Sequence, residues 1–163
     1  MRLGQEWDGT AGRLPVMLSY EASAVSRAAP EEVWAAWIDV ASWSASDHIE
    51  SARLDGEFHP GGVISSKAKG FPGSTLTITR VESPRLWVDE SRSFGMHMTF
   101  DHTIEAGDDG TTLTERVVIH GPLGRLVGPM MRRKLEALFA ASVAEVARRA
   151  EEAEKTNGEA APS

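Results

Sequence analysis

Runs of alternating apolar and polar residues fill the middle of the chain, and turn residues separate them. Alternation with a period of two is typical of a strand that buries one of its faces. The strands predicted from this pattern are residues 19–28, 48–54, 62–69, 75–82, 86–93, 96–105 and 111–121. Tight-turn pairs such as Asp55-Gly56 and Phe94-Gly95 separate successive strands. We therefore expect the last six strands to form an antiparallel meander.

Helical periodicity marks two further parts of the chain. Pro30 suits the first turn of a helix, and the two acidic residues after it favour the positive N-terminal end. A second short helix is predicted at 39–43. Near the C-terminus apolar residues recur at helical spacing, which predicts a helix over about 125–154 that is roughly 45 Å long. Gly128 and Pro129 should bend or delay its first turn.

This order of elements predicts an α+β fold in which helices cover one face of an antiparallel sheet. The 163 residues fit one domain, and a hydrophobic fraction of 41% is enough for a core. We assign the domain to residues 18–154. Residues 1–17 are Gly-rich and are expected to be an irregular arm, and residues 155–163 have a disordered composition.

Charge and cysteine content exclude several classes of function. The net charge of −7 argues against nucleic acid and against contact with an anionic membrane, although it also simply favours solubility. The chain has no cysteine, which excludes disulfides, thiolate nucleophiles and cysteine-ligated metals. Without a secretory signal or a long apolar run, we expect a cytoplasmic protein that is a monomer or a homodimer.

The register of the last predicted hairpin places a polar pair on an apolar face. With its turn centred at Asp108-Asp109, His102 lies opposite Glu115. The other residues that share their face are Met98, Phe100, Ile104, Leu113, Val117 and Ile119. The pair has either a functional or a structural role. It holds a polar group of a ligand or serves as an acid and a base. Otherwise the two side chains hydrogen-bond to each other as a structural patch, or they reach solvent at the mouth of the cavity. His102 and Glu115 are thus the catalytic candidates.

The neighbouring strand allows two choices of inward face. If Leu86 points inward, so do Val88 and Glu90, with Arg92 as a possible partner near the mouth; an inward Trp87 would reverse this parity. We take Val88 and Glu90 as lining residues. Met98, Met130 and Met131 would add an adaptable wall, and Trp43 would be a core or cavity-cap residue.

No metal site or cofactor is expected. His97 and Asp101 alternate away from His102, so these three side chains cannot converge on one ion. The chain lacks a Gly-x-Ser-x-Gly nucleophile elbow, and its Gly-rich turns do not precede helices as phosphate-binding loops do.

Several motifs in order resemble one known superfamily. They are Ala-Pro-Glu-Glu-Val-Trp-Ala-Ala-Trp at 29–37 with Trp43 nearby, Gly-Glu-Phe-His-Pro-Gly-Gly at 56–62, Ser-Pro-Arg-Leu at 83–86, Gly-Thr-Thr-Leu-Thr-Glu-Arg at 110–116 and Gly-Pro-Leu at 121–123. Over nearly the whole domain the chain resembles the START-like SRPBCC superfamily, in its polyketide cyclase/dehydrase branch. The resemblance implies a helix-grip fold, in which a seven-stranded sheet wraps the C-terminal helix around a cavity.

The resemblance leaves three functions open, because this fold serves several. The first is binding of an apolar or aromatic small molecule, either a lipid or a polyketide-like compound, with His102 and Glu115 fixing its polar group. The second is a polyketide cyclase or dehydrase that needs no cofactor. The third is an interaction module like the activators of chaperone ATPases, which would have a filled interior in place of a cavity.

Overall fold

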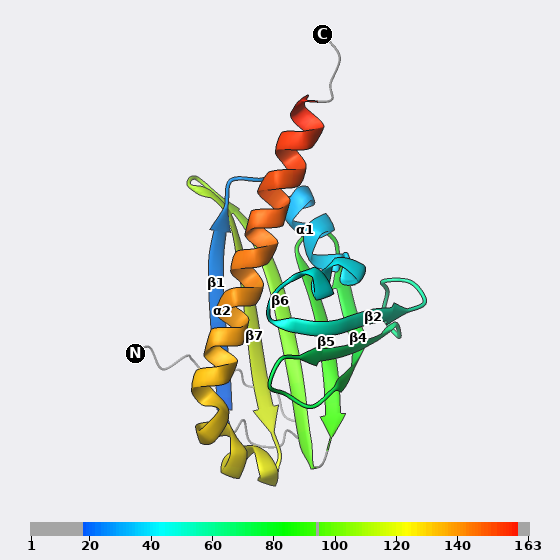
Figure 1. Ribbon diagram of the computed structural model, residues 1–163, viewed down its shortest axis with the longest axis vertical. Coiled ribbons are helices and arrows are strands. Elements are labelled where there is room, and N and C mark those ends of the chain that lie inside the picture. The colour runs from blue at the N-terminus through cyan, green and yellow to red at the C-terminus, as the bar shows by residue number, and fades with distance from the viewer. Residues whose placement is uncertain (1–17, 94, 160–163) are drawn as a thin grey trace.

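The computed structural model describes residues 18–93 and 95–159 and shows a curled sheet beside one long helix (Figure 1). The strands are β1 Leu18–Ser26, β2 Ile49–Asp55, β3 Val63–Ala68, β4 Ser74–Glu82, β5 Leu86–Ser93, β6 Met96–Gly107 and β7 Gly110–His120. They form one seven-stranded sheet in the order β1-β7-β6-β5-β4-β3-β2, and every neighbouring pair is antiparallel. The predicted α+β helix-grip architecture is confirmed.

Three helical segments accompany the sheet. They are α1 Pro30–Ile38, the 3-10 helix η1 Val40–Ala45, and α2 Pro122–Glu159. The predicted bounds of the last helix are wrong at both ends, since α2 begins three residues before 125 and ends five residues after 154. Residues 155–159 are helical because an established helix extends at little cost. The expected arm at 1–17 and the last four residues of the expected tail lie outside the described residues.

Pro129 lies inside α2 and does not delay its start. A proline lacks the backbone N–H that would bond to the preceding turn, and it therefore favours a bend. Figure 1 shows the first turns of α2 at an angle to the remainder of the helix.

Hydrogen bonds join α2 to β1 and to the turn after it. The Tyr20 hydroxyl donates to the carbonyl of Gly128 at 3.1 Å, and the Ser26 hydroxyl donates to the carbonyl of Ala147 at 3.2 Å. The backbone N–H of Arg27 donates to the Glu151 carboxylate at 2.9 Å. The long helix therefore packs chiefly against β1 and α1, and only lightly against β6.

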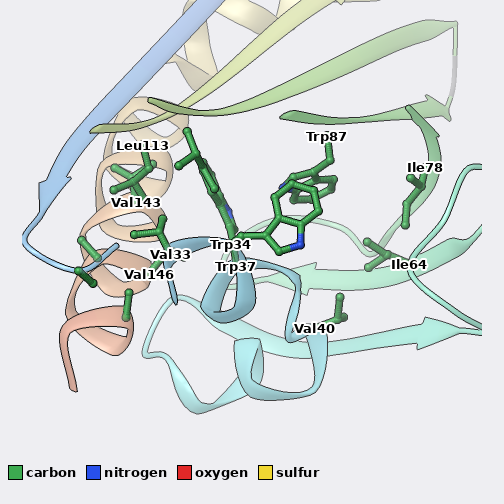
Figure 2. Close-up of a cluster of buried hydrophobic side chains, with 14 residues drawn as sticks. Val33, Trp34, Trp37, Val40, Ile64, Ile78, Trp87, Leu113, Val143 and Val146 are labelled. Carbon is green, nitrogen blue, oxygen red and sulfur yellow. The ribbon is translucent and has the colours of Figure 1, made fainter. Parts of the chain in front are cut away.

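The main core lies where α1 and α2 meet the concave face of the sheet. Figure 2 shows its side chains extending from Val143 on α2 across α1 toward Ile78 on β4. Trp37 and Trp87 are almost fully buried there, with ring centroids 6.4 Å apart and planes at 89°. Edge-to-face contacts of this kind are favourable beyond the apolar area that they bury.

Truncating Leu113 should test how far stability depends on this core. Leu113 on β7 is fully buried, so Leu113→Ala should lower the free energy of unfolding by about 2–5 kcal/mol, because it removes buried apolar contacts and leaves a void. Urea unfolding followed by circular dichroism measures the change. The control is Val25→Ala, at a side chain that is 57% exposed, which should change stability by less than about 0.5 kcal/mol. Equal losses in the two variants would contradict the placement of the core.

Candidate functional site

A cavity of about 420 Å³ lies between the concave face of the sheet and α2. The inner faces of β3 to β7 form one wall, and α2 from Leu123 to Val146 forms another. Apolar residues from these walls and from η1 include Trp43, Met98, Phe100, Ile119, Met131 and Leu138. The volume is in the range of pockets that hold drug-sized molecules, which are also lined mostly by apolar side chains.

Three buried ionisable side chains interrupt the apolar wall. Asp89, His102 and Glu115 are 1%, 5% and 8% exposed, and all three line the cavity. They come from neighbouring strands, since β5 pairs with β6 and β6 pairs with β7. His102 lies between the two carboxyl groups: Nδ1 is 4.0 Å from Asp89 Oδ2, and Nε2 is 3.8 Å from Glu115 Oε1. Both distances exceed that of a hydrogen bond.

Several polar atoms of this cluster make no hydrogen bond to any described residue. They are both carboxylate oxygens of Asp89, Nδ1 of His102 and Oε2 of Glu115. The indole Nε1 of Trp87 also has no hydrogen-bond partner among the described residues. A buried polar atom without a partner costs about 1–3 kcal/mol. Such atoms concentrated at one place in a cavity indicate a position where a bound molecule would complete the hydrogen bonds.

Two tryptophans fix the orientation of the His102 ring. Trp87, its direct partner across the β5–β6 pair, stacks on it with centroids 3.5 Å apart and planes at 5°. Trp37 of α1 contacts it edge-on, with centroids 5.2 Å apart and planes at 84°. The imidazole therefore has little freedom to turn toward either carboxyl group.

Burial shifts the ionisation of all three groups toward their neutral forms. Burial lowers the pKa of His102 to about 3. Burial raises the pKa of Glu115 to about 7, against the opposing effect of a hydrogen bond from the Ser142 hydroxyl. Burial, with the nearby charge of Glu115 as a smaller cause, raises the pKa of Asp89 well above its ordinary value. Near pH 7 the cluster thus holds a neutral imidazole and a Glu115 close to its midpoint, and burial favours the protonated form of Asp89.

This arrangement can donate and accept hydrogen bonds and can move a proton near neutral pH. A carboxyl group whose pKa is close to the working pH suits general acid–base catalysis. Metal binding has no matching geometry, since no group of three or more potential ligands within residues 18–93 and 95–159 is placed to hold an ion.

A family model described as polyketide cyclase/dehydrase and lipid transport matches residues 17–151. The chain belongs to this family. The match confirms the resemblance to the START-like superfamily and supports ligand binding or cyclisation at the level of the family. No curated protein matches the sequence. Within the described part of α2 and α1, no helix is long and apolar enough to cross a membrane.

Solved structures share the fold of this family member. The Zhui aromatase/cyclase from Streptomyces sp. R1128 has a TM-score of 0.71 at 17% identity, covering 86% of this chain and 98% of that one. The di-domain ARO/CYC StfQ from the steffimycin biosynthetic pathway also has a TM-score of 0.71, at 12% identity and 86% coverage of this chain. This chain spans only 52% of StfQ. Ara h 8.0201 has a TM-score of 0.59 at 19% identity, covering 79% of this chain and 97% of that one.

The predicted hairpin register is confirmed in this family member. His102 pairs with Glu115, Phe100 with Val117 and Met98 with Ile119, as alternation required. Of these residues, Met98, Phe100, His102, Glu115 and Ile119 line the cavity, together with Trp43 and Met131. Their contact with a ligand stays a prediction.

The predicted inward face of β5 is wrong. Trp87 pairs with His102 and is 1% exposed, so Trp87, Asp89 and Ser91 point inward. Alternation then places Val88 and Glu90 on the convex face. There Glu90 Oε2 lies 2.9 Å from Nε2 of His97, and it does not reach the cavity.

Two further predicted lining residues lie elsewhere. Met130 is 83% exposed, because it lies on the side of α2 that faces away from the sheet. Val117 does point inward, but it packs with Tyr20 and Phe139 in a second part of the core and does not line the cavity.

Four cavity-lining residues were not predicted from the sequence: Asp89, Trp37, His48 and Ser142. Asp89 could have been predicted from the sequence, because strand alternation places it on the same face as Trp87, a large apolar residue that is expected to be buried. Ser142 carries no signal of its own. It faces the cavity only because α2 lies beside β1 in this particular rotation.

Glu115→Gln should reveal the raised pKa through stability. From about pH 4.5 to 7 the unfolded chain loses the Glu115 proton and the folded chain keeps it, so this group makes folding less favourable as pH rises. The lowered pKa of His102 acts oppositely from about pH 3 to 6.5, in both proteins. The stability of Glu115→Gln relative to the native chain should therefore rise by about 3 kcal/mol across the Glu115 window. Urea unfolding at a series of pH values measures it.

The matched control is Glu105→Gln, at an exposed carboxyl group of the β6–β7 hairpin. The stability of Glu105→Gln relative to the native chain should not rise between about pH 4.5 and 7. A flat difference for Glu115→Gln as well would show that Glu115 is not held in its neutral form.

Proposed function

We propose that this protein binds an apolar or aromatic small molecule, lipid or polyketide-like, whose polar group lies at Asp89, His102 and Glu115. The observation that carries the proposal is the group of unpartnered polar atoms inside a mostly apolar cavity. Membership of the polyketide cyclase/dehydrase and lipid transport family supports it.

The distances around His102 support a ligand group between the strands. At 3.8 Å and 4.0 Å the imidazole is too far from either carboxyl group for a hydrogen bond, and its stacking on Trp87 prevents a closer approach. A single oxygen or nitrogen atom of a ligand can bond to two of the three groups at once. Each bond formed there gains more than it would in water, because the alternative is an unpartnered buried atom.

The remainder of the cavity supplies the affinity. Apolar contact with Phe100, Met131 and Leu138 contributes about 25 cal/mol for each Å² of apolar surface removed from water. The polar cluster then sets the orientation of the ligand more than its affinity. An interaction module of the chaperone-activator type requires a filled interior, and a cavity of about 420 Å³ gives that alternative no support.

Two neighbouring methionines of α2 provide a matched test of binding in the cavity. Met131 lines the cavity and Met130 is 83% exposed. Met131→Trp should weaken binding by about tenfold or more, because the larger side chain takes up space that the ligand needs, and Met130→Trp should bind as the native chain does. Isothermal titration calorimetry with a panel of lipids, flavonoids and aromatic polyketides measures the affinities.

Saturable binding that is lost only in Met131→Trp is the expected outcome. The absence of saturable binding across the whole panel would count against the proposal. Equal effects of the two substitutions would place the binding site outside the cavity.

A second candidate function is cyclisation of a polyketone. The raised pKa values of the Glu115 and Asp89 carboxyl groups favour it. Ionised Glu115 can take a proton from the carbon between two carbonyl groups. The carbanion then attacks another carbonyl carbon of the same molecule, a C–C bond forms, and the new alkoxide takes the proton of Asp89. The carboxyl groups together neither gain nor lose a proton. Loss of water from the product completes a dehydration.

This candidate gives Glu115 a role that simple binding does not. Glu115→Gln keeps the shape and should lower kcat about 100-fold or more, with ligand affinity changed less than about threefold. Ring formation from a soluble poly-β-ketone thioester is followed by absorbance and mass spectrometry. Glu105→Gln, on the exposed part of the β6–β7 hairpin, is the control and should keep full activity. Equal loss of binding and turnover in Glu115→Gln would indicate a binding protein only.

A further inference from the structure

The cavity wall carries acidic side chains without lysine or arginine among the described residues. Its ionisable members among the described residues are Asp89, Glu115, His102 and His48, and none of the described lining residues is a lysine or an arginine. Two carboxyl groups, one on either side of His102, therefore share one apolar enclosure without a lysine or an arginine among its described lining residues. Both are more than nine-tenths buried, and both carry oxygens without a hydrogen-bond partner.

We propose that the polar group of the ligand is a protonated amine on an apolar or aromatic skeleton, bound at the carboxyl groups of Asp89 and Glu115 on either side of His102, and that ligands ending in a carboxylate are excluded. This inference rests on the proposed binding function and specifies which ligands the site accepts.

Hydrogen-bond chemistry at the cluster supports an amine. A primary ammonium group has three donors and no acceptor. The unpartnered oxygens of Asp89 and Oε2 of Glu115 would accept its hydrogen bonds when the carboxyl groups are ionised, whereas the unpartnered Nε1 of Trp87 is a donor and would not bond to it. Nδ1 of His102 is also without a partner and can accept a bond in one tautomer of the neutral ring. Charge-assisted bonds of this kind are about twice as strong as neutral ones.

Aromatic residues in the same wall add to the attraction. Trp37, Trp43, Trp87 and Phe100 all line the cavity. A cation within about 6 Å of an aromatic ring face is attracted by the negative face of the ring, and more strongly where water is excluded. A carboxylate would meet the opposite conditions. It would bring a third acidic group beside two buried ones, and no cation of the described wall would offset its charge.

Ionisation of the carboxyl groups links amine binding to pH. Burial holds the pKa of Glu115 at about 7 and that of Asp89 well above its ordinary value, and a cation nearby favours their charged forms. The groups that face them are His102 on β6 and the Ser142 hydroxyl on α2; the carboxylates of Glu90 and Asp101, on the convex face, act on Asp89 only through their charge. Binding of an amine should therefore release protons into the buffer.

His48, at another part of the wall, is the other titrating group to consider. Burial lowers its pKa, with Glu145 and Arg149 of α2 among the charges around it. Protonation of His48 at low pH would also repel a cation. The Glu115→Gln variant separates the two effects, because it leaves His48 unchanged.

Three ligands with one skeleton test the proposal: naphthylethylamine, naphthylethanol and naphthylacetate. Isothermal titration calorimetry on the full chain near pH 8 should show the amine binding about tenfold or more tightly than the alcohol, and the carboxylate more weakly than the alcohol. The ratio of amine to alcohol affinity should fall as the pH is lowered to about 5.5, because the carboxyl groups become protonated. Titrations in buffers of different ionisation enthalpy should show proton release with the amine alone.

Glu115→Gln should reduce the ratio of amine to alcohol affinity by about fivefold or more, because it removes one of the two carboxyl groups that bind the cation. The control Glu105→Gln, on the exposed part of the hairpin, should leave this ratio unchanged. The native chain alone already gives the affinity order and the proton release, so the test does not depend on the variant being stable.

The outcomes separate the two proposals. An alcohol that binds as tightly as the amine, or a carboxylate that binds more tightly, would overturn the amine inference and leave the binding function standing. Failure of all three ligands and of the wider panel would overturn the binding function itself.

Discussion

The attachment of α2 to one edge of the sheet is the constraint on which the cavity depends. Tyr20 and Ser26 lie at opposite ends of β1 and bond to α2 nineteen residues apart, at Gly128 and Ala147. The helix is therefore held along β1, and it does not settle into the middle of the concave face. Because the sheet curls away from β1 toward β2, a space remains between α2 and strands β3 to β7. Apolar side chains reduce that space without filling it.

Polar groups persist in this space because the backbone determines where they point. Inward positions on β5, β6 and β7 bring Asp89, His102 and Glu115 together whether or not their hydrogen bonds are complete. The surrounding tryptophan contacts hold the imidazole away from both carboxyl groups. A fold that only needed stability would gain by replacing the three groups with apolar residues of similar shape. Their presence is the strongest physical indication that the enclosure serves a ligand.

The sequence predicted the fold and one hairpin of the site well, for a physical reason. Period-two alternation and tight turns report local geometry, so the pairing of His102 with Glu115 follows from the position of a single turn. Strand β5 was harder, because Leu86 and Trp87 are both large and apolar, and either can begin the buried face. Periodicity alone could not decide between Glu90 and Asp89. The rotation of α2 was harder still: Met130 and Met131 are adjacent, and only tertiary packing shows which one faces the cavity.

Strand alternation has a consequence for how proteins of this shape diverge. The turn at 83–85 sets which residues of β5 point inward. A single residue inserted or deleted in that turn would exchange Trp87, Asp89 and Ser91 for Val88, Glu90 and Arg92 on the inner face. The wall would lose its stacked indole and acquire a guanidinium, while the length and pairing of the sheet stayed much the same. One codon added to or removed from a turn would thus give the acidic groups of the enclosure a basic partner, because Glu115 would stay and Glu90 and Arg92 would join it.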